Sequence, residues 1–169
     1  MNEHQLQAYV ADALAAYEGP LLRYAGHLCR DPELAKDAVQ DTFVKLWQAS
    51  GKQPPEKLAA WLFKVCRHRV FEILRKDKRM ISMEPTEVPA TETAESPQQA
   101  FAETEQVQAV TALLGRLPAR QQELVRLKFQ NGLSYQEISE VTGLSVSNVG
   151  VILHQAMTGL RQRAAVHGL

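Results

Sequence analysis

Apolar residues recur at helical spacing along most of the chain. A first apolar stripe runs from Leu6 to Leu28 and is interrupted at Gly19-Pro20. That interruption predicts either one kinked helix or two helices. Asp31-Pro32 then supplies an N-cap and a proline at the first helical position, so a second helix is expected to run to about Ser50.

The next periodic segment, from about Glu56 to Arg79, has two chemically different faces. One face is apolar. The other is basic with an aromatic residue among the cations, and it consists of Lys64, Arg67, His68, Phe71, Arg75 and Arg79. Cations that follow a phosphate backbone and planar groups that stack on bases suit single-stranded nucleic acid. This face is therefore a candidate nucleic-acid surface.

Residues 80–105 differ in composition from the segments on either side. They are rich in Pro, Thr, Glu and Ala and contain no Lys or Arg. This composition predicts a flexible acidic linker, and about 25 extended residues reach on the order of 80 Å. Its carboxylates include Glu84, Glu87, Glu92 and Glu95, and a merely solubilising tether would fit this composition.

The C-terminal part contains the clearest local pattern. After a helix from Val107 and another that starts at Pro118, Ser134 and Glu137 have the spacing of a capping box. Gly143 permits a tight turn, and Ser145 can cap a following helix. This arrangement indicates a helix-turn-helix, whose second helix enters the major groove of DNA. Taken alone, it also suits two packed helices of an adaptor bundle.

Composition and charge narrow the function classes. Lys and Arg number 19, as do Asp and Glu, so net charge alone indicates no partner. The charges are unevenly placed, because residues 80–115 carry no basic and 6 acidic side chains between two mildly basic ends. Cys29 and Cys66 lie in no metal-ligand spacing, which favours buried thiols in a reducing cytoplasm. No apolar run approaches the ~20 residues that span a bilayer.

Three segments occur in the order found in one known family. DAVQDTFVKLWQ, residues 37–48, resembles the helix by which extracytoplasmic-function sigma factors of the sigma-70 family bind core RNA polymerase. The run from Trp61 is similar to their −10 recognition and promoter-melting helix. LPARQQELVRLKFQNGLSYQEISEVTGLSVSNV, residues 117–149, is similar to their −35-binding domain.

The resemblance implies an all-α protein of two small helical domains joined by the acidic linker, with boundaries at 1–79, 80–105 and 106–169. It also implies that the linker runs through a basic channel of the polymerase, which the linker glutamates would suit as well as they suit a solubilising tether. It implies a cytoplasmic protein with no direct membrane insertion. The implied partners are core RNA polymerase, contacted at the beta-prime clamp and the beta flap, promoter DNA and an anti-sigma factor. The implied core-binding residues are Asp37, Gln40, Asp41, Phe43, Lys45 and Trp47. The basic face listed above is assigned to −10 DNA, and Ser145, Ser147, Asn148, Gly150, Val151, His154 and Gln155 to −35 DNA.

Some positions depart from the family pattern. His68 stands where Asn is common, and Glu72 stands where Asp is common. In the recognition helix, Gly150 to Ile152 replace residues that are often basic, and Gln155 replaces a common Arg. These departures predict an altered choice of base at −10 and few phosphate contacts at −35.

Two other functions compete with this interpretation. A regulator that binds DNA without joining the polymerase would leave residues 37–48 and the basic face unexplained. A helical adaptor would bind only protein. An enzyme is the least supported class, because the sequence shows no phosphate loop, no paired catalytic carboxylates and no Ser/His/Asp arrangement. No catalytic residue, metal ligand or cofactor is expected.

Overall fold

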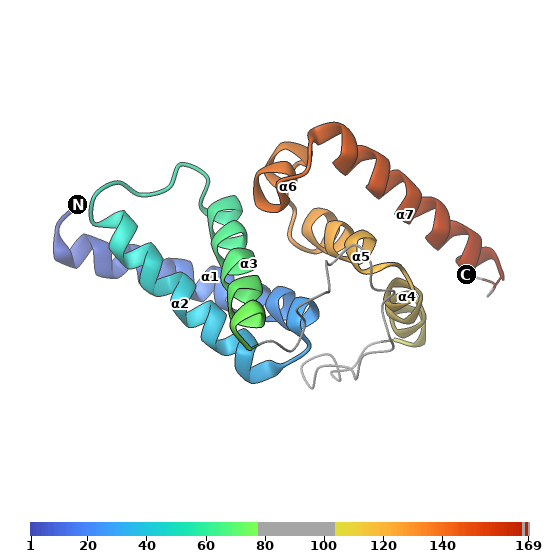
Figure 1. Cartoon of the computed structure of the whole chain (residues 1–169), viewed down its shortest axis with the longest axis horizontal. Coiled ribbons are helices and arrows are strands. Elements are labelled where there is room, and N and C mark those ends of the chain that lie inside the picture. Colours follow the sequence, from blue (N-terminus) through green and yellow to red (C-terminus); the bar gives the residue numbers. More distant parts are fainter. Residues whose placement is uncertain (78–103, 167, 169) are drawn as a thin grey trace.

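The computed structural model describes residues 1–77, 104–166 and 168, and every regular element in these ranges is helical. The N-terminal half contains α1 (Glu3–Cys29), α2 (Pro32–Ser50) and α3 (Leu58–Asp77). The C-terminal half contains α4 (Glu105–Gly115), α5 (Ala119–Val125), the π-helical segment η2 (Arg126–Gln130), α6 (Tyr135–Thr142) and α7 (Val146–Val166) (Figure 1). The predicted all-α fold is confirmed.

The helices begin where local capping signals predict them. The Asp31 carboxylate accepts hydrogen bonds from the backbone N–H groups of Glu33 and Leu34, and Pro32 occupies the first turn. At the first apolar stripe, the structure selects between the two predicted arrangements. α1 is one helix with Pro20 inside it, because apolar residues on both sides of the proline are buried on the same face.

The N-terminal half is a three-helix unit around large apolar side chains. α1, α2 and α3 pack on one another, and the fully buried side chains include Leu21, Tyr24, Leu46, Leu62 and Phe63. The rings of Tyr24 and Phe63 meet edge to face with centroids 5.2 Å apart. The buried thiols predicted for Cys29 and Cys66 are confirmed, and burial raises the pKa of Cys66 to about 12.

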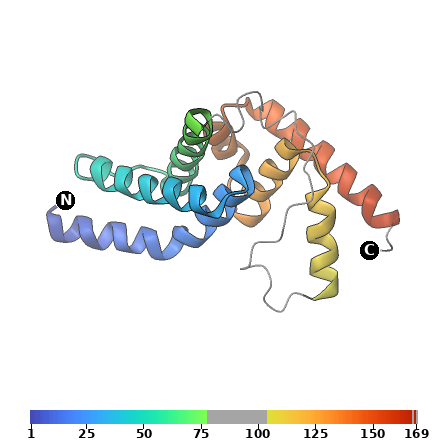
Figure 2. The same ribbon diagram turned by 60° about the horizontal axis from the view of Figure 1, so that its bottom comes forward.

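The two halves of the chain share one apolar core, which the sequence did not predict. α6 packs against α3, and α5 contacts α1 (Figure 1 and Figure 2). Leu124, Leu127 and Ile138 of the C-terminal half belong to the same buried cluster as Leu21 and Phe63 of the N-terminal half. The C-terminal half therefore lies over part of the α3 surface.

Two expectations fall partly outside the described residues. Arg79 and the predicted linker glutamates at positions 84, 87, 92 and 95 lie there. At the predicted end of the linker, Thr104 already caps α4, since its hydroxyl accepts a hydrogen bond from the Val107 N–H at 3.2 Å. None of the described helices is long and apolar enough to cross a membrane.

Candidate nucleic-acid and protein-binding surfaces

An apolar groove lies between α1 and α2. It is lined by Val10, Leu14, Glu18, Val39, Gln40, Phe43, Val44, Trp47 and Gln48. Its most exposed apolar side chains are those of Val44, 55% exposed, and Trp47, 37% exposed. Exposed apolar groups beside a groove are the usual mark of a protein-binding surface. We call this set of nine residues the α1/α2 groove.

The residues predicted to bind the core polymerase fall into two groups. Asp37, Gln40, Lys45 and Trp47 are exposed, whereas Phe43 is buried and lines the groove. Phe43 thus supports the surface from within. Sequence reasoning missed Val44 and the α1 side of the groove, because the pattern of residues 37–48 gives no signal for which helix packs beside them.

The Asp41 carboxylate forms an ion pair within the protein. It accepts a hydrogen bond from Arg69 Nε at 2.6 Å, and Arg69 Nη1 also donates to Glu72 at 2.9 Å. This ion pair ties α2 to α3. A charge reversal at Asp41 would therefore repel Arg69 and disturb this packing as well as any contact with a partner.

The basic face of α3 is only partly open to solvent. Lys64, His68 and Arg75 are exposed. Arg67 is different, because only 11% of its side chain is exposed, and its guanidinium carbon lies 4.8 Å from the ring centroid of Phe71. Of the described residues predicted to bind −10 DNA, these three are accessible, whereas Arg67 and Phe71 contact each other.

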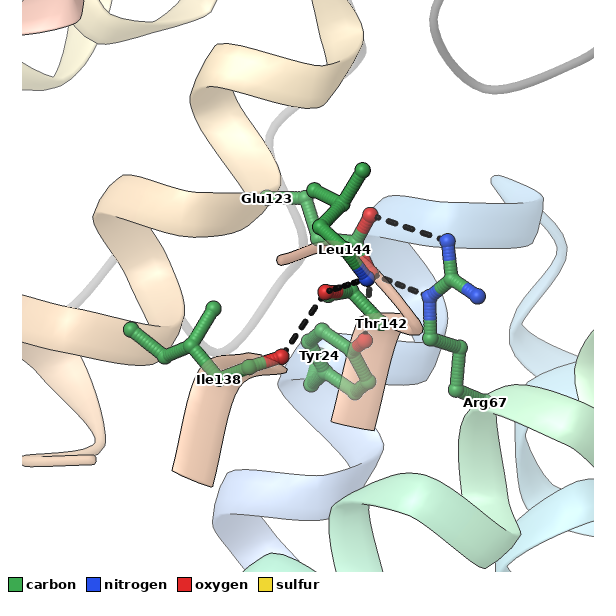
Figure 3. Close-up of polar contacts among 6 residues, drawn as sticks. All are labelled: Tyr24, Arg67, Glu123, Ile138, Thr142 and Leu144. Carbon is green, nitrogen blue, oxygen red and sulfur yellow. Dashed lines mark hydrogen bonds and ion pairs between the residues drawn. The ribbon is translucent and has the colours of Figure 1, made fainter. Parts of the chain in front are cut away.

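Glu123 of α5 is the second partner of Arg67. Arg67 Nε donates to one carboxylate oxygen at 2.7 Å and Nη2 donates to the other at 3.4 Å. The hydroxyl of Tyr24, on α1, donates to the same carboxylate at 2.5 Å. Figure 3 shows the three side chains converging from three helices, with Glu123 between the other two. Only 2% of the Glu123 side chain is exposed.

This cluster alters the proton affinities of its members. Burial raises the pKa of Tyr24 well above its usual value, and the Glu123 carboxylate raises it further. Burial alone would lower the pKa of Arg67, but the neighbouring carboxylate outweighs it and the net shift is upward. Tyr24 therefore remains a hydrogen-bond donor and Arg67 remains charged at neutral pH.

His68 lies among cations. Its pKa is lowered by partial burial and by the charges of Lys64, Arg67, Lys45 and Arg75. An unperturbed imidazole can gain charge near neutral pH. In the structure the neutral form is favoured, and a neutral imidazole has one hydrogen-bond donor and one acceptor.

The predicted helix-turn-helix is confirmed in its local chemistry. Ser134 and Glu137 form a reciprocal capping box at the start of α6, and Gly143 ends that helix with φ 79°. The hydroxyl of Ser139 donates to the Leu144 carbonyl at 2.6 Å, which holds the turn. The Ser145 hydroxyl accepts from the Asn148 N–H at 3.1 Å and caps α7.

The start of α7 presents the residues predicted to contact −35 DNA. Ser145, Ser147, Asn148, Val151, His154 and Gln155 are all exposed, while Val149 and Leu153 are buried. Gly150 is half-buried, and a Cβ atom added there would lie 3.6 Å from the Tyr135 ring, an ordinary contact. The Lys128 Nζ atom already lies 5.3 Å from the centroid of that ring.

In the part of the chain that the structure describes, no cluster of side chains could hold a metal ion.

The lowered pKa of His27 predicts how the stability of the folded protein varies with pH. Burial, helped by the charges of Arg126, Arg23 and Arg30, lowers its pKa from 6.5 to about 4. Between these pH values the unfolded chain binds a proton that the folded chain does not, so this group's contribution to stability is present above pH 6.5 and is lost as pH falls towards 4. The loss should reach about 1–3 kcal/mol.

Urea unfolding at a series of pH values between 7 and 5 measures this effect. His27→Gln should give a flatter dependence of the unfolding free energy on pH, because glutamine does not titrate. Equal slopes for the two proteins would show that His27 is not buried beside these cations in solution.

Comparison with known proteins identifies the family. Residues 14–80 match Sigma-70 region 2, and residues 107–160 match Sigma-70 region 4. The chain is 30% identical to the ECF RNA polymerase sigma factor EcfG of Rhodopseudomonas palustris, over 93% of this chain and 85% of that protein. It is 28% identical to the RNA polymerase sigma factor YlaC of Bacillus subtilis, over 90% of each.

Solved structures show the same fold. The sigma factor RpoE in complex with the anti-sigma factor NepR from Bartonella quintana matches with a TM-score of 0.68 and 25% identity, covering 90% of this chain and 94% of that one. CnrH in complex with the cytosolic domain of CnrY matches with a TM-score of 0.63 and 22% identity, over 95% and 90%. The chain therefore belongs to the ECF family of RNA polymerase sigma factors, which direct promoter recognition and transcription initiation and are not enzymes.

Proposed function

We propose that this sigma factor binds its partners through three separate surfaces. The α1/α2 groove with the exposed residues of α2 binds core RNA polymerase, the basic face of α3 binds the −10 element, and the first turns of α7 bind the −35 element. The observation that carries this proposal is that each surface lies on a different helix and has the chemistry that its task requires. The corresponding domain boundaries are 1–79 and 106–169, with 80–105 as the connection.

The α2 surface suits a large protein partner. Val44 and Trp47 supply apolar contact area, and Asp37, Gln40 and Lys45 add exposed polar groups on the same helix. Apolar anchors within a polar rim are typical of protein interfaces, where charges fix the orientation of the partner. The family implies that the partner here is the beta-prime clamp, and that the C-terminal half contacts the beta flap.

An anti-sigma factor is a further proposed partner. The two solved structures described above are both complexes of two proteins, and in one of them a sigma factor is bound to an anti-sigma factor. The likeness covers both halves of the chain. A protein that covers the α1/α2 groove would compete with the core polymerase for it.

His68 is expected to influence the base chosen at −10. It is exposed on the basic face and favours a neutral imidazole, whose hydrogen-bond geometry differs from that of asparagine. His68→Asn should therefore change the preferred base at one position and leave the others unchanged. Selection from promoters with a randomised −10 element measures this, with His154→Asn on α7 as the matched control. Identical −10 profiles for His68→Asn and the unmodified protein would rule out base selection by His68.

Binding to core polymerase in the absence of DNA tests the proposal against its alternatives. A sigma factor must form this complex, whereas a regulator that acts only through DNA need not. A fluorescence titration of the labelled full chain with core should show saturable binding. A forked promoter shifted by the resulting holoenzyme, and not by core alone, would exclude a protein-only adaptor. Absence of core binding would contradict the proposal.

A further inference from the structure

An ion pair between α2 and α3 lies beside the surface that we propose binds the core polymerase. Asp41 of α2 is about one helical turn from both Asp37 and Val44, so these three side chains lie on one side of that helix. Val44 is 55% exposed, and 41% of the Asp41 side chain is exposed. A protein that covers Val44 would therefore also cover Asp41.

The ion pair uses only one oxygen of the Asp41 carboxylate. Arg69 Nε donates to Oδ2 at 2.6 Å, whereas Oδ1 accepts no hydrogen bond from the described residues. A carboxylate can accept about four hydrogen bonds. Asp41 can therefore accept a hydrogen bond from a binding partner and keep its contact with Arg69.

Arg69 is itself held from a second side. Its Nη1 donates to Glu72 Oε1 at 2.9 Å, and the Lys76 Nζ atom lies 3.6 Å from the same oxygen. Only 26% of the Arg69 side chain is exposed. The hydrogen bond to Asp41 raises the pKa of Arg69 more than partial burial lowers it, so the guanidinium stays charged. This restrained cation in turn restricts the orientation of the Asp41 carboxylate.

We infer that Arg69 is a positioning residue for core RNA polymerase, because from α3 it holds the Asp41 carboxylate in place for a cationic donor of the polymerase that binds Oδ1. This inference rests on the proposed role of the α2 surface in binding the core. A Lys or Arg of the partner fits this oxygen best, because hydrogen bonds between charged groups are stronger than neutral ones. Arg69 thus contributes to core binding without touching the polymerase.

Positioning and competition predict opposite effects of Arg69. If Arg69 positions Asp41, its removal lets the carboxylate rotate, and core binding must then restrict that rotation and loses affinity. If Arg69 competes with the polymerase for Asp41, its removal should raise the affinity. The geometry favours positioning, because Oδ1 stays available while Oδ2 is bound.

The experiment measures core affinity by fluorescence titration of labelled variants of the full chain. Arg69→Met removes the guanidinium and keeps an unbranched side chain, and Asp41→Asn removes the charge of its partner. Lys76→Met is the matched control, because it removes a cation of α3 that lies beside Glu72 and forms no ion pair with Asp41. Circular dichroism and thermal unfolding of each variant check that the helices remain folded.

Arg69→Met should weaken core binding roughly three- to tenfold, and Lys76→Met should leave it unchanged. Asp41→Asn should weaken it at least as much. Adding Arg69→Met to Asp41→Asn should cause little further loss, because the two residues act through one contact. Unchanged or tighter core binding in Arg69→Met, or losses that simply add in the double variant, would overturn the inference.

A charge-swapped variant separates positioning from a purely structural role. Asp41→Arg combined with Arg69→Asp restores an ion pair between α2 and α3 but presents a cation to the polymerase. Its unfolding temperature should therefore exceed that of Asp41→Arg alone, while its core affinity stays low. Recovery of core affinity in the swapped variant would show that the pair serves only helix packing, which also overturns the inference.

Failure of this inference is distinguishable from failure of the proposed function. Val44→Glu changes the apolar part of the α2 surface and leaves the ion pair between Asp41 and Arg69 in place. Weaker core binding in Val44→Glu together with normal binding in Arg69→Met would contradict only the role of Arg69. Unchanged core binding in Val44→Glu would contradict the α2 surface itself.

Discussion

Val44→Glu is expected to weaken binding to core RNA polymerase by roughly tenfold to a hundredfold, which corresponds to the loss of an apolar anchor at an interface. Val44 is 55% exposed beside the α1/α2 groove and makes no contribution to the buried core. The new carboxylate should therefore remain hydrated in the free protein. On binding, it would have to be buried against the partner without a paired charge, which is costly.

A fluorescence titration of labelled protein with core measures this effect. Val166→Glu is the matched control, because it makes the same substitution at an exposed position near the end of α7. Both variants should unfold at the temperature of the unmodified protein. Equal core affinities for the unmodified protein and Val44→Glu would show that the groove does not face the polymerase.

Asn148→Ala is expected to make the free energy of binding to −35 DNA less favourable by about 1–3 kcal/mol. The loss should depend mainly on the identity of one base pair. The Asn148 side chain is exposed at the start of α7, where an amide can contact both hydrogen-bonding atoms of an adenine edge. The exposed part of this helix has no Lys or Arg before Arg161. Specificity should therefore depend on neutral contacts, and the salt dependence of binding should be shallow.

Gly150→Lys should have a different effect. It adds one cation where a Cβ atom meets only ordinary contact with Tyr135. One additional phosphate contact increases the slope of log affinity against log salt by about 0.9, and affinity should rise on all sequences alike. A salt series with the full chain on selected and scrambled duplexes tests both variants. A steep slope in the unmodified protein would contradict the assignment of neutral contacts.

Local structure was predictable from sequence because its causes are local. Asp31, Ser134 and Ser145 cap helices through hydrogen bonds to residues two or three positions later, and Gly143 adopts the positive φ that the turn needs. The outward residues of α7 follow from helical spacing around Val149 and Leu153. Such contacts depend on neighbours in the chain, which a single sequence displays.

The arrangement of the two halves was not predictable in this way. The Arg67 to Glu123 ion pair joins residues 56 positions apart, and the Tyr24 hydrogen bond spans 99 positions. In the sequence, Arg67 is one cation among several on the basic face, and Glu123 is one carboxylate on a short helix. The sequence therefore predicted a DNA-binding role for Arg67 but gave no sign that Glu123 of the same chain pairs with it.

Sequencing of transcripts made by core polymerase with and without the full chain tests the central claim most directly. Genomic DNA from the source organism serves as template. With the chain present, we predict new transcript starts preceded by one shared pair of −10 and −35 sequences, and Asn148→Ala should alter preference only in the −35 sequence. Transcript starts that are the same with and without the chain, or that share no upstream sequence, would contradict the account.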